Sequence, residues 1–143
     1  MLGPDLVSSK GPQVLAGHSH DCLREQANFL KRAHEKNDTN TLYMVANELH
    51  SALSKHIREE ECVNGWFAEA VRMEPKLSKA ISHLKGEHVE LLKTLQEITR
   101  CSDDDLALLR AHVHRFLSLF RKHEAHEGKI IDHVFYEDLG GPS

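Results

Sequence analysis

Histidine and glutamate recur in this chain at spacings that suit metal binding. Twelve of the 143 residues are histidines, against one Trp and two Tyr, and histidine is both a common metal ligand and a proton carrier near neutral pH. A lone His followed by a His-x-x-x-Glu motif occurs twice, and its two histidines are 36 positions apart in the first copy and 35 positions apart in the second. The members are His20, His56 and Glu60, then His88, His123 and Glu127. On a helix, an i, i+4 pair lies on one face about 6 Å apart along the axis, so each motif presents an imidazole and a carboxylate to one centre.

Apolar residues at helical spacing accompany these six, which predicts that they face a protein interior. His20 and His88 each begin a stripe whose apolar members follow after 3, 7 and 10 residues. In the two segments that carry the motifs, an apolar stripe leads up to the motif instead. The stripe residues are Leu23, Ala27 and Leu30; Leu42, Ala46, Leu49, Leu53 and Val63; Leu77, Ile81, Leu84, Leu91, Leu95 and Ile98; and Leu109, Val113, Phe116, Phe120 and Ile130.

Three clusters of turn-forming residues divide the chain into four helices. They lie at 37–40, 73–75 and 102–105, and in the last of them Ser102 and Asp105 have the spacing of a capping box. Because no segment alternates as a strand would, we expect an all-α fold, an antiparallel up-down-up-down four-helix bundle. The predicted helices cover residues 14–36, 41–72, 76–100 and 103–136.

The length of the chain suits a single domain, which we expect at 14–136. Residues 1–13 and 137–143, which are rich in Gly and Pro, are expected to be flexible tails.

The six chemically active residues are predicted to lie in one layer across the bundle. In an antiparallel hairpin, residues at equal height lie equally far from the turn, and the midpoint between His20 and His56 is residue 38, inside the first break. The midpoint between Glu60 and His88 likewise falls in the second break. Four imidazoles and two carboxylates in an apolar interior are costly unless something satisfies them. Two carboxylates that can each bridge two cations imply a di-metal site in the core. The mixed nitrogen and oxygen donors favour iron, with Mn or Zn as lesser alternatives.

Composition excludes several other classes of function. The formal net charge of −4 lacks the basic excess that nucleic-acid binding requires. No apolar run approaches the roughly 20 residues of a membrane helix and the first residues lack a signal pattern, so we expect a cytoplasmic protein. The three cysteines have no CxxC spacing and indicate neither a disulfide framework nor a zinc knuckle.

Four segments resemble the motifs of the hemerythrin-like (HHE cation-binding) domains. GHSHDCL and GEHVELL are similar to the first and third helix motifs of that family, and SKHIREEECV and RKHEAHEGKI to the second and fourth. The resemblance implies a non-haem di-iron centre with an oxo or hydroxo bridge, in which Glu60 and Glu127 bridge the irons and the four histidines bind them. Family members carry oxygen, sense oxygen or redox state, handle nitric oxide or peroxide, or regulate iron.

One departure from the family pattern concerns a fifth histidine. The oxygen carrier of the family has one four residues before the third-helix ligand, where this chain has Leu84, with His83 beside it. His83 would need a local helical irregularity near Gly86 to reach the metals. Glu124 and Glu59 are the other candidate additional ligands. Phe67 and Val134, each eleven residues after a motif histidine, are expected to line the pocket together with Leu84, and Trp66 to pack at its rim.

Three classes of function remain open at this point. The domain could bind or sense O₂, NO or peroxide; it could be an enzyme, peroxidase-like, catalase-like, an oxidase or active on NO; or it could buffer iron without turnover. The missing fifth histidine weighs against reversible oxygen carriage. No Ser/His/Asp, Cys/His or phosphate-loop arrangement indicates another enzyme class.

Overall fold

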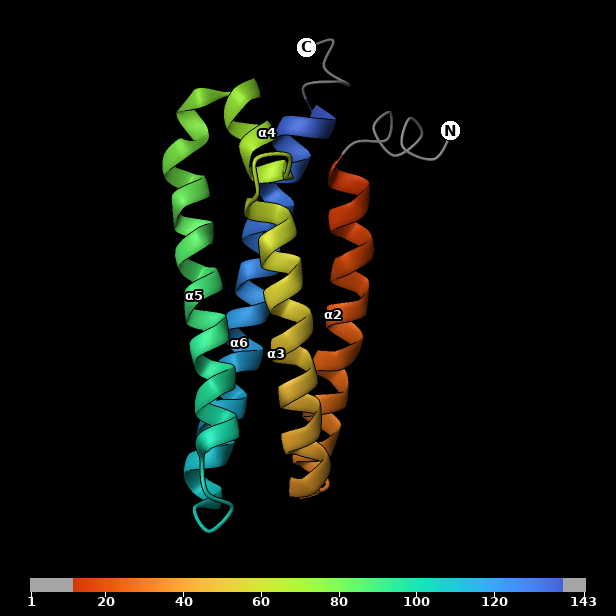
Figure 1. Ribbon diagram of the computed structural model, residues 1–143, viewed down its shortest axis with the longest axis vertical. Helices are drawn as coiled ribbons and strands as arrows, with labels where there is room; N and C mark the ends of the chain where they lie inside the picture. The colour runs from red at the N-terminus through yellow and green to blue at the C-terminus, as the bar shows by residue number, and fades with distance from the viewer. Residues whose placement is uncertain (1–11, 138–143) are drawn as a thin grey trace.

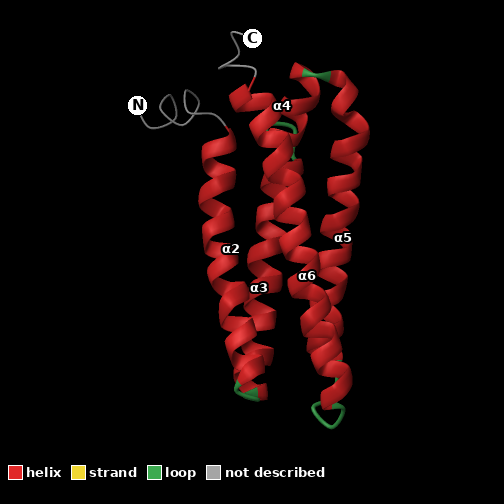
Figure 2. Ribbon diagram, turned by 180° about the vertical axis from the view of Figure 1, so that it is seen from behind, coloured by secondary structure: helices red, strands yellow, loops and turns green. Residues whose placement is uncertain are grey.

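Four long antiparallel helices form the molecule. The structure is a computed structural model that describes the backbone of residues 12–137 and the side chains of residues 20–136, and this part of the chain contains no strand (Figure 2). The helices run alternately down and up the bundle (Figure 1). The predicted all-α four-helix bundle is therefore confirmed. The long helices are α2 (Pro12–Glu35), α3 (Thr39–Glu61), α5 (Ser78–Arg100) and α6 (Leu106–Ile131).

The ends of the chain are only partly described. Residues 1–11 and 138–143, which make up most of the two predicted tails, lie outside the described part of the chain. None of the helices within residues 12–137 has the length and apolarity that crossing a bilayer requires.

Aspartate side chains cap the N-termini of α3 and α6, the helices that follow the two turns at the lower end of Figure 1. Asp38 accepts a hydrogen bond from the backbone N–H of Thr41, at 3.2 Å, and caps α3. Asp105 accepts one from the N–H of Leu108, at 3.0 Å, and caps α6. The predicted start of this helix at 103, with Ser102 as the cap, is therefore wrong. The Ser102 hydroxyl instead accepts a bond from the N–H of Asp104, two residues on, which holds the turn before the helix.

The predicted single helix over 41–72 is also wrong, because the chain breaks at 62–65. α3 ends at Glu61, and a separate short helix, α4 (Trp66–Met73), follows and leads through the 3₁₀ turn η1 (Pro75–Leu77) into α5. Gly65 makes the break possible, since a Cβ at this position would overlap the carbonyl oxygens of Glu59 and Glu60. Val63, expected in the apolar stripe of this helix, lies in the break and is 81% exposed.

A π-helical segment, η2 (Asp132–Glu137), continues α6. Its wider turn changes the helical register, and two consecutive residues, Val134 and Phe135, are both buried. The end of the molecule that contains α4 and η2 is thus less regular than the end with the two tight turns (Figure 1).

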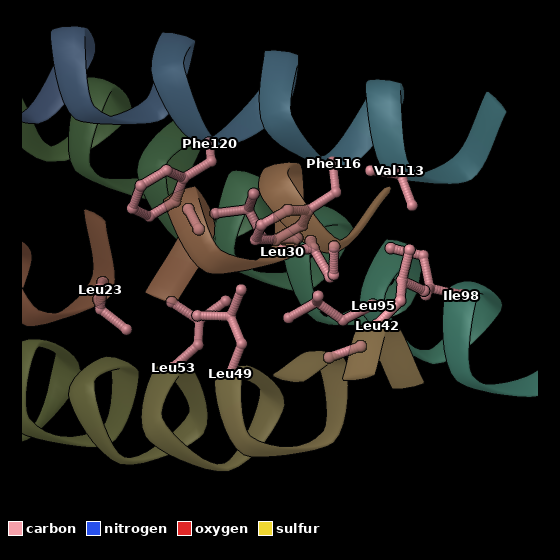
Figure 3. Packing of buried hydrophobic residues seen from close by; sticks show 14 of the residues in the cluster. Leu23, Leu30, Leu42, Leu49, Leu53, Leu95, Ile98, Val113, Phe116 and Phe120 are labelled. Carbon is pink, nitrogen blue, oxygen red and sulfur yellow. The ribbon is translucent and has the colours of Figure 1, made fainter. Parts of the chain in front are cut away.

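The apolar interior consists of two clusters. The larger one, which we call the main core, draws residues from all four long helices and fills the bundle toward the two tight turns; it runs from Leu23 to Phe120 along the chain and is shown in Figure 3. The smaller one, the end core, packs α4 and η2 against the start of α5. Its members are Trp66, Phe67, Ala70, Ile81, Leu84, Val134 and Phe135.

Candidate metal centre

Six polar side chains separate the two cores. On α5, the end-core residue Leu84 comes before His88 and the main-core residue Leu91 after it. The order is reversed along α3 and α6, where main-core residues come before the layer and the end-core residues follow on the next elements, α4 and η2. The six are at most 7% exposed, and they come from all four long helices. They are the residues that the duplicated motif singled out, namely His20, His56, Glu60, His88, His123 and Glu127.

Two carboxylates occupy the middle of this layer, and two pairs of histidines flank them. The donor atoms form two groups, each lying within 4.8 Å: His20 and His56 with both glutamates, and His88 and His123 with the same two glutamates. Because Glu60 and Glu127 belong to both groups, the layer can hold two metal ions that share both carboxylates.

Equivalent contacts occur in the two halves of the bundle, which are α2 with α3 and α5 with α6. The Nε2 of His56 lies 3.1 Å from Oε2 of Glu60, and the Nε2 of His123 lies 3.1 Å from Oε2 of Glu127, as the two i, i+4 motifs require. Each carboxylate also reaches the other half of the bundle. The Nε2 of His88 lies 3.2 Å from Oε1 of Glu60, and the Nε2 of His20 lies 2.6 Å from Oε1 of Glu127.

Several of the atoms that face the centre of the layer make no hydrogen bond among the described residues, although Nε2 of His20 lies 2.6 Å from one of them, Oε1 of Glu127. They include Nε2 of His56 and His88, Oε1 of Glu60 and both carboxylate oxygens of Glu127. Leaving a buried polar atom unsatisfied costs roughly 1–3 kcal/mol, and five such atoms in one layer are rare in a native interior. Metal ions bound between them would satisfy all five, so the donor set fits a metal centre.

The outer nitrogens of three of the histidines face carboxylates. Nδ1 of His88 donates a hydrogen bond to Glu61 across 2.6 Å, and Nδ1 of His123 donates to Glu87 across 2.7 Å. The outer nitrogen of His20 lies 3.5 Å from Glu124. With Nδ1 holding the proton, the lone pair of a neutral imidazole sits on Nε2 and faces the centre, which is the usual arrangement of metal-binding histidine.

Sequence reasoning missed the roles of Glu61 and Glu87. Glu61 directly follows Glu60 and Glu87 directly precedes His88, so each lies about 100° around its helix from a member of the layer. That offset takes the side chain toward the neighbouring helix. An acid next to a motif residue was the available signal, although exposed acids are common at such positions.

The pKa values of the layer show how strongly its groups depend on one another. Burial alone would lower the pKa of His20, but its contacts with Glu124, Glu127 and Glu60 outweigh burial and raise the pKa to about 11. For His88 as well, contacts with carboxylates outweigh burial, and they raise its pKa to about 10. Burial would raise the pKa of Glu127, but contacts with His123, His20 and His88 lower it to about 2, and the pKa of Glu60 is also lowered. The two carboxylates therefore favour cations beside them, either imidazolium or metal.

Trp66 lies much closer to the layer than sequence reasoning placed it. Its side chain is buried rather than at a rim, and its indole Nε1 donates a hydrogen bond to Oε2 of Glu60, at 2.7 Å. The break before α4 turns Trp66 back toward the end of α3. A continuous helix could not have brought the two residues together in this way, because six positions are about 600° of rotation.

The three residues predicted to line the pocket lie together beside the layer. Phe67, Leu84 and Val134 are all buried in the end core. The ring of Phe67 stacks on the imidazole of His88, with centroids 5.3 Å apart and an interplanar angle of 8°. An apolar wall thus borders the layer on this side.

The structure does not bring the three additional candidate ligands into the layer. The helical irregularity that His83 would need is absent, since α5 is a regular helix through Gly86, and the His83 side chain is 69% exposed. Glu59 is exposed on the outside of α3. Glu124 faces the outer nitrogen of His20 and accepts a hydrogen bond from Nε of Arg24 at 2.6 Å, so it lies behind a layer histidine rather than among the inward donors.

These observations define a class of protein, a four-helix bundle whose interior is arranged to bind metal. The model of the hemerythrin HHE cation-binding domain matches residues 17–138. The match covers most of the chain and includes the whole layer, and the chain belongs to this family. Comparisons with curated proteins and with solved structures gave no significant match.

Proposed function

We propose that this chain is a non-haem di-iron protein that binds or reacts with a small ligand such as O₂, NO or peroxide. The observation that carries the proposal is the sharing of Glu60 and Glu127 between two pairs of inward histidine nitrogens. In this assignment His20 and His56 would hold one metal, and His88 and His123 would hold the other. Iron is favoured over Mn or Zn because sites of mixed imidazole and carboxylate donors with open positions are typical of non-haem iron.

An open position at the metals supports reaction with a small ligand. Each metal would have two imidazoles and oxygens from the two shared carboxylates, which leaves room in the roughly six positions that iron commonly uses. Among the described side chains no fifth imidazole fills that room, because α5 presents Leu84 toward the end core and His83 toward solvent. Bound iron would act as Lewis acid and redox centre, while the chain orients it and limits access to it.

The alternative is oxygen, redox or iron sensing, or iron buffering, without turnover. The wall of Phe67, Leu84 and Val134 beside His88 favours this alternative, because an apolar surround keeps water and proton donors away from a bound ligand. Both functions use the same site, so they differ only in the fate of the bound ligand.

Metal content tests the site itself. Protein purified from iron-replete cells should contain two iron atoms per chain, and the double variant Glu60→Ala/Glu127→Ala should contain none while keeping its helical circular dichroism. The matched control is Glu48→Ala/Glu59→Ala, which removes two exposed carboxylates from α3 and should keep the iron. An iron-free parent protein, or iron retained after loss of both shared carboxylates, would refute the proposal.

Optical spectroscopy separates the two functions. The iron-loaded protein is reduced without oxygen, and its spectrum is followed as O₂, NO or peroxide is added. A band that appears and reverses when the ligand is removed indicates binding or sensing. Continuous consumption of the ligand indicates catalysis.

A further inference from the structure

A second group of metal-binding side chains lies on the surface between α5 and α6. His83 and Glu87 are one turn apart on α5, and His126 comes from α6. Their donor atoms all lie within 4.8 Å of one another. Nδ1 of His126 is 2.5 Å from Oε2 of Glu87, and Nε2 of His83 is 3.4 Å from the same oxygen. Two imidazoles from different helices therefore converge on one carboxylate oxygen.

This group is accessible, unlike the buried layer. The side chain of His83 is 69% exposed and that of His126 is 44% exposed, whereas the side chain of Glu87 is only 19% exposed. His83, Gly86 and Glu87 also line a surface groove of about 400 Å³. Because Gly86 has no side chain and nothing lies within 4 Å of its Cβ position, the groove leaves space beside the donors for water ligands.

The donor chemistry restricts the kind of ion. Two imidazoles and one carboxylate suit divalent first-row transition metals such as zinc, whereas calcium and magnesium prefer sites made only of oxygen. The other charged groups of the groove are Lys122, which opposes a cation, and Glu90, which favours one and pairs with Arg115 at 3.2 Å. Because Glu90 is already paired with Arg115, Glu87 is the carboxylate that would supply negative charge to a bound cation.

We propose that His83, Glu87 and His126 form a surface site for a divalent transition metal, separate from the buried layer. The donors of this site come from α5 and α6, and none of them is one of the six residues of the layer. A consequence that does rest on the proposed di-iron function comes from Glu87, whose other oxygen accepts a hydrogen bond from His123 at 2.7 Å. A metal bound to the Glu87 carboxylate weakens the hydrogen bond that this carboxylate accepts from His123. Filling the surface site therefore perturbs the buried centre.

Zinc binding to three proteins tests the surface site. The parent protein, the double variant His83→Ala/His126→Ala and a control are dialysed against the same low concentration of Zn²⁺, and bound zinc is counted. The control is His34→Ala/His114→Ala, which removes a different cross-helix histidine pair, with ring centroids 5.1 Å apart, that has no third donor within reach among the described residues. Glu87 is left unchanged, since its loss would also disturb His123.

The readout is the difference in bound zinc per chain between the proteins. Zinc or iron in the layer is common to all three proteins and cancels in this difference. The parent should bind one zinc more than His83→Ala/His126→Ala, and the control should match the parent. Equal binding by the parent and the double variant would overturn the site, as would an equal loss in the control.

The coupling is measured on iron-loaded protein. Zn²⁺ has no visible absorption of its own, so added zinc should shift the iron bands of the parent and leave those of His83→Ala/His126→Ala unchanged. Unchanged bands in a parent that has bound the additional zinc would overturn the coupling while leaving the surface site in place.

Discussion

The indole of Trp66 donates a hydrogen bond to the carboxylate of Glu60, with 2.7 Å between Nε1 and Oε2. Trp66 is the first residue of α4, and Glu60 lies in the last turn of α3, so the short helix inserted after the chain break is tied to a shared carboxylate of the layer. The same oxygen lies 3.1 Å from Nε2 of His56. The irregular end of the bundle therefore helps to orient the candidate ligands.

Replacing Trp66 with Phe should weaken metal binding. The variant keeps a large ring in the end core but leaves Oε2 of Glu60 without its donor, so the carboxylate can rotate away from its position between the two pairs of histidines. We expect metal affinity to fall by roughly 10- to 100-fold, the usual effect of losing a hydrogen bond to a metal ligand. Competition with a chelator of known affinity measures the change.

Tyr43→Phe is the matched control for this variant. The Tyr43 hydroxyl donates to the carbonyl of Cys101 at 2.7 Å, at the far end of the bundle. Its loss should lower the free energy of unfolding by about 1 kcal/mol and leave metal affinity unchanged. Equal metal affinities for the two variants would show that the Trp66 bond does not orient Glu60.

Glu61→Gln should weaken metal binding for a related reason. Glu61 accepts a hydrogen bond from the outer nitrogen of His88, and a neutral amide holds that proton less firmly than a carboxylate. We expect affinity to fall by roughly 10- to 100-fold, measured by chelator competition. Glu59→Gln makes the same change two positions earlier on an exposed side chain and should have no effect. A larger loss from Glu59→Gln would make Glu59 a candidate ligand again.

The duplicated motif of a lone His followed by His-x-x-x-Glu made the layer predictable from the sequence. The chain break at 62–65 and the carboxylates behind the layer histidines were not predictable in this way. A buried histidine such as His88 continues a helical stripe, and helical periodicity can be counted along the sequence. The need for glycine at 65 depends on the approach of a carbonyl from the preceding helix, which no periodicity records. Glu87 likewise acts on His123, 36 residues away on another helix, so only the packing of α5 on α6 shows its role.

Gly65→Ala should destabilise the protein by roughly 1–3 kcal/mol. The added Cβ would overlap the backbone of α3, which cannot move as a flexible side chain could, so α4 must shift. Urea unfolding followed by circular dichroism measures the change. Gly86→Ala is the opposite case, because its Cβ would meet nothing within 4 Å inside α5, and it should stabilise the protein by roughly 0.5–1 kcal/mol. A stabilised Gly65→Ala protein would contradict this account of the break.

The stability of the metal-free protein should be greatest between about pH 4.5 and pH 6.5. Histidines whose pKa is raised on folding contribute fully below the ordinary value of 6.5, and that contribution is lost as pH rises through the raised pKa values of about 10 for His88 and about 11 for His20. Glu127, whose pKa is lowered to about 2, contributes above 4.5 and loses its contribution as pH falls toward 2.

Urea unfolding of the metal-free protein should therefore give a smaller free energy at about pH 9 than at about pH 5.5. Metal-loaded protein provides the contrast, because protons compete with metal for histidine and acidification weakens binding. A metal-free protein that gains stability from pH 6.5 to pH 9 would contradict the raised pKa values of His20 and His88.

The polar layer between the main core and the end core bears on how the molecule holds together. Apolar contact makes a domain unfold cooperatively, but here charged groups interrupt that contact across the width of the bundle. In the metal-bound state proposed above, coordination by the six side chains would join the two parts across the layer, where apolar contact does not. We therefore expect the metal-loaded bundle to melt in one transition, and the metal-free bundle to lose the end core and the main core one after the other.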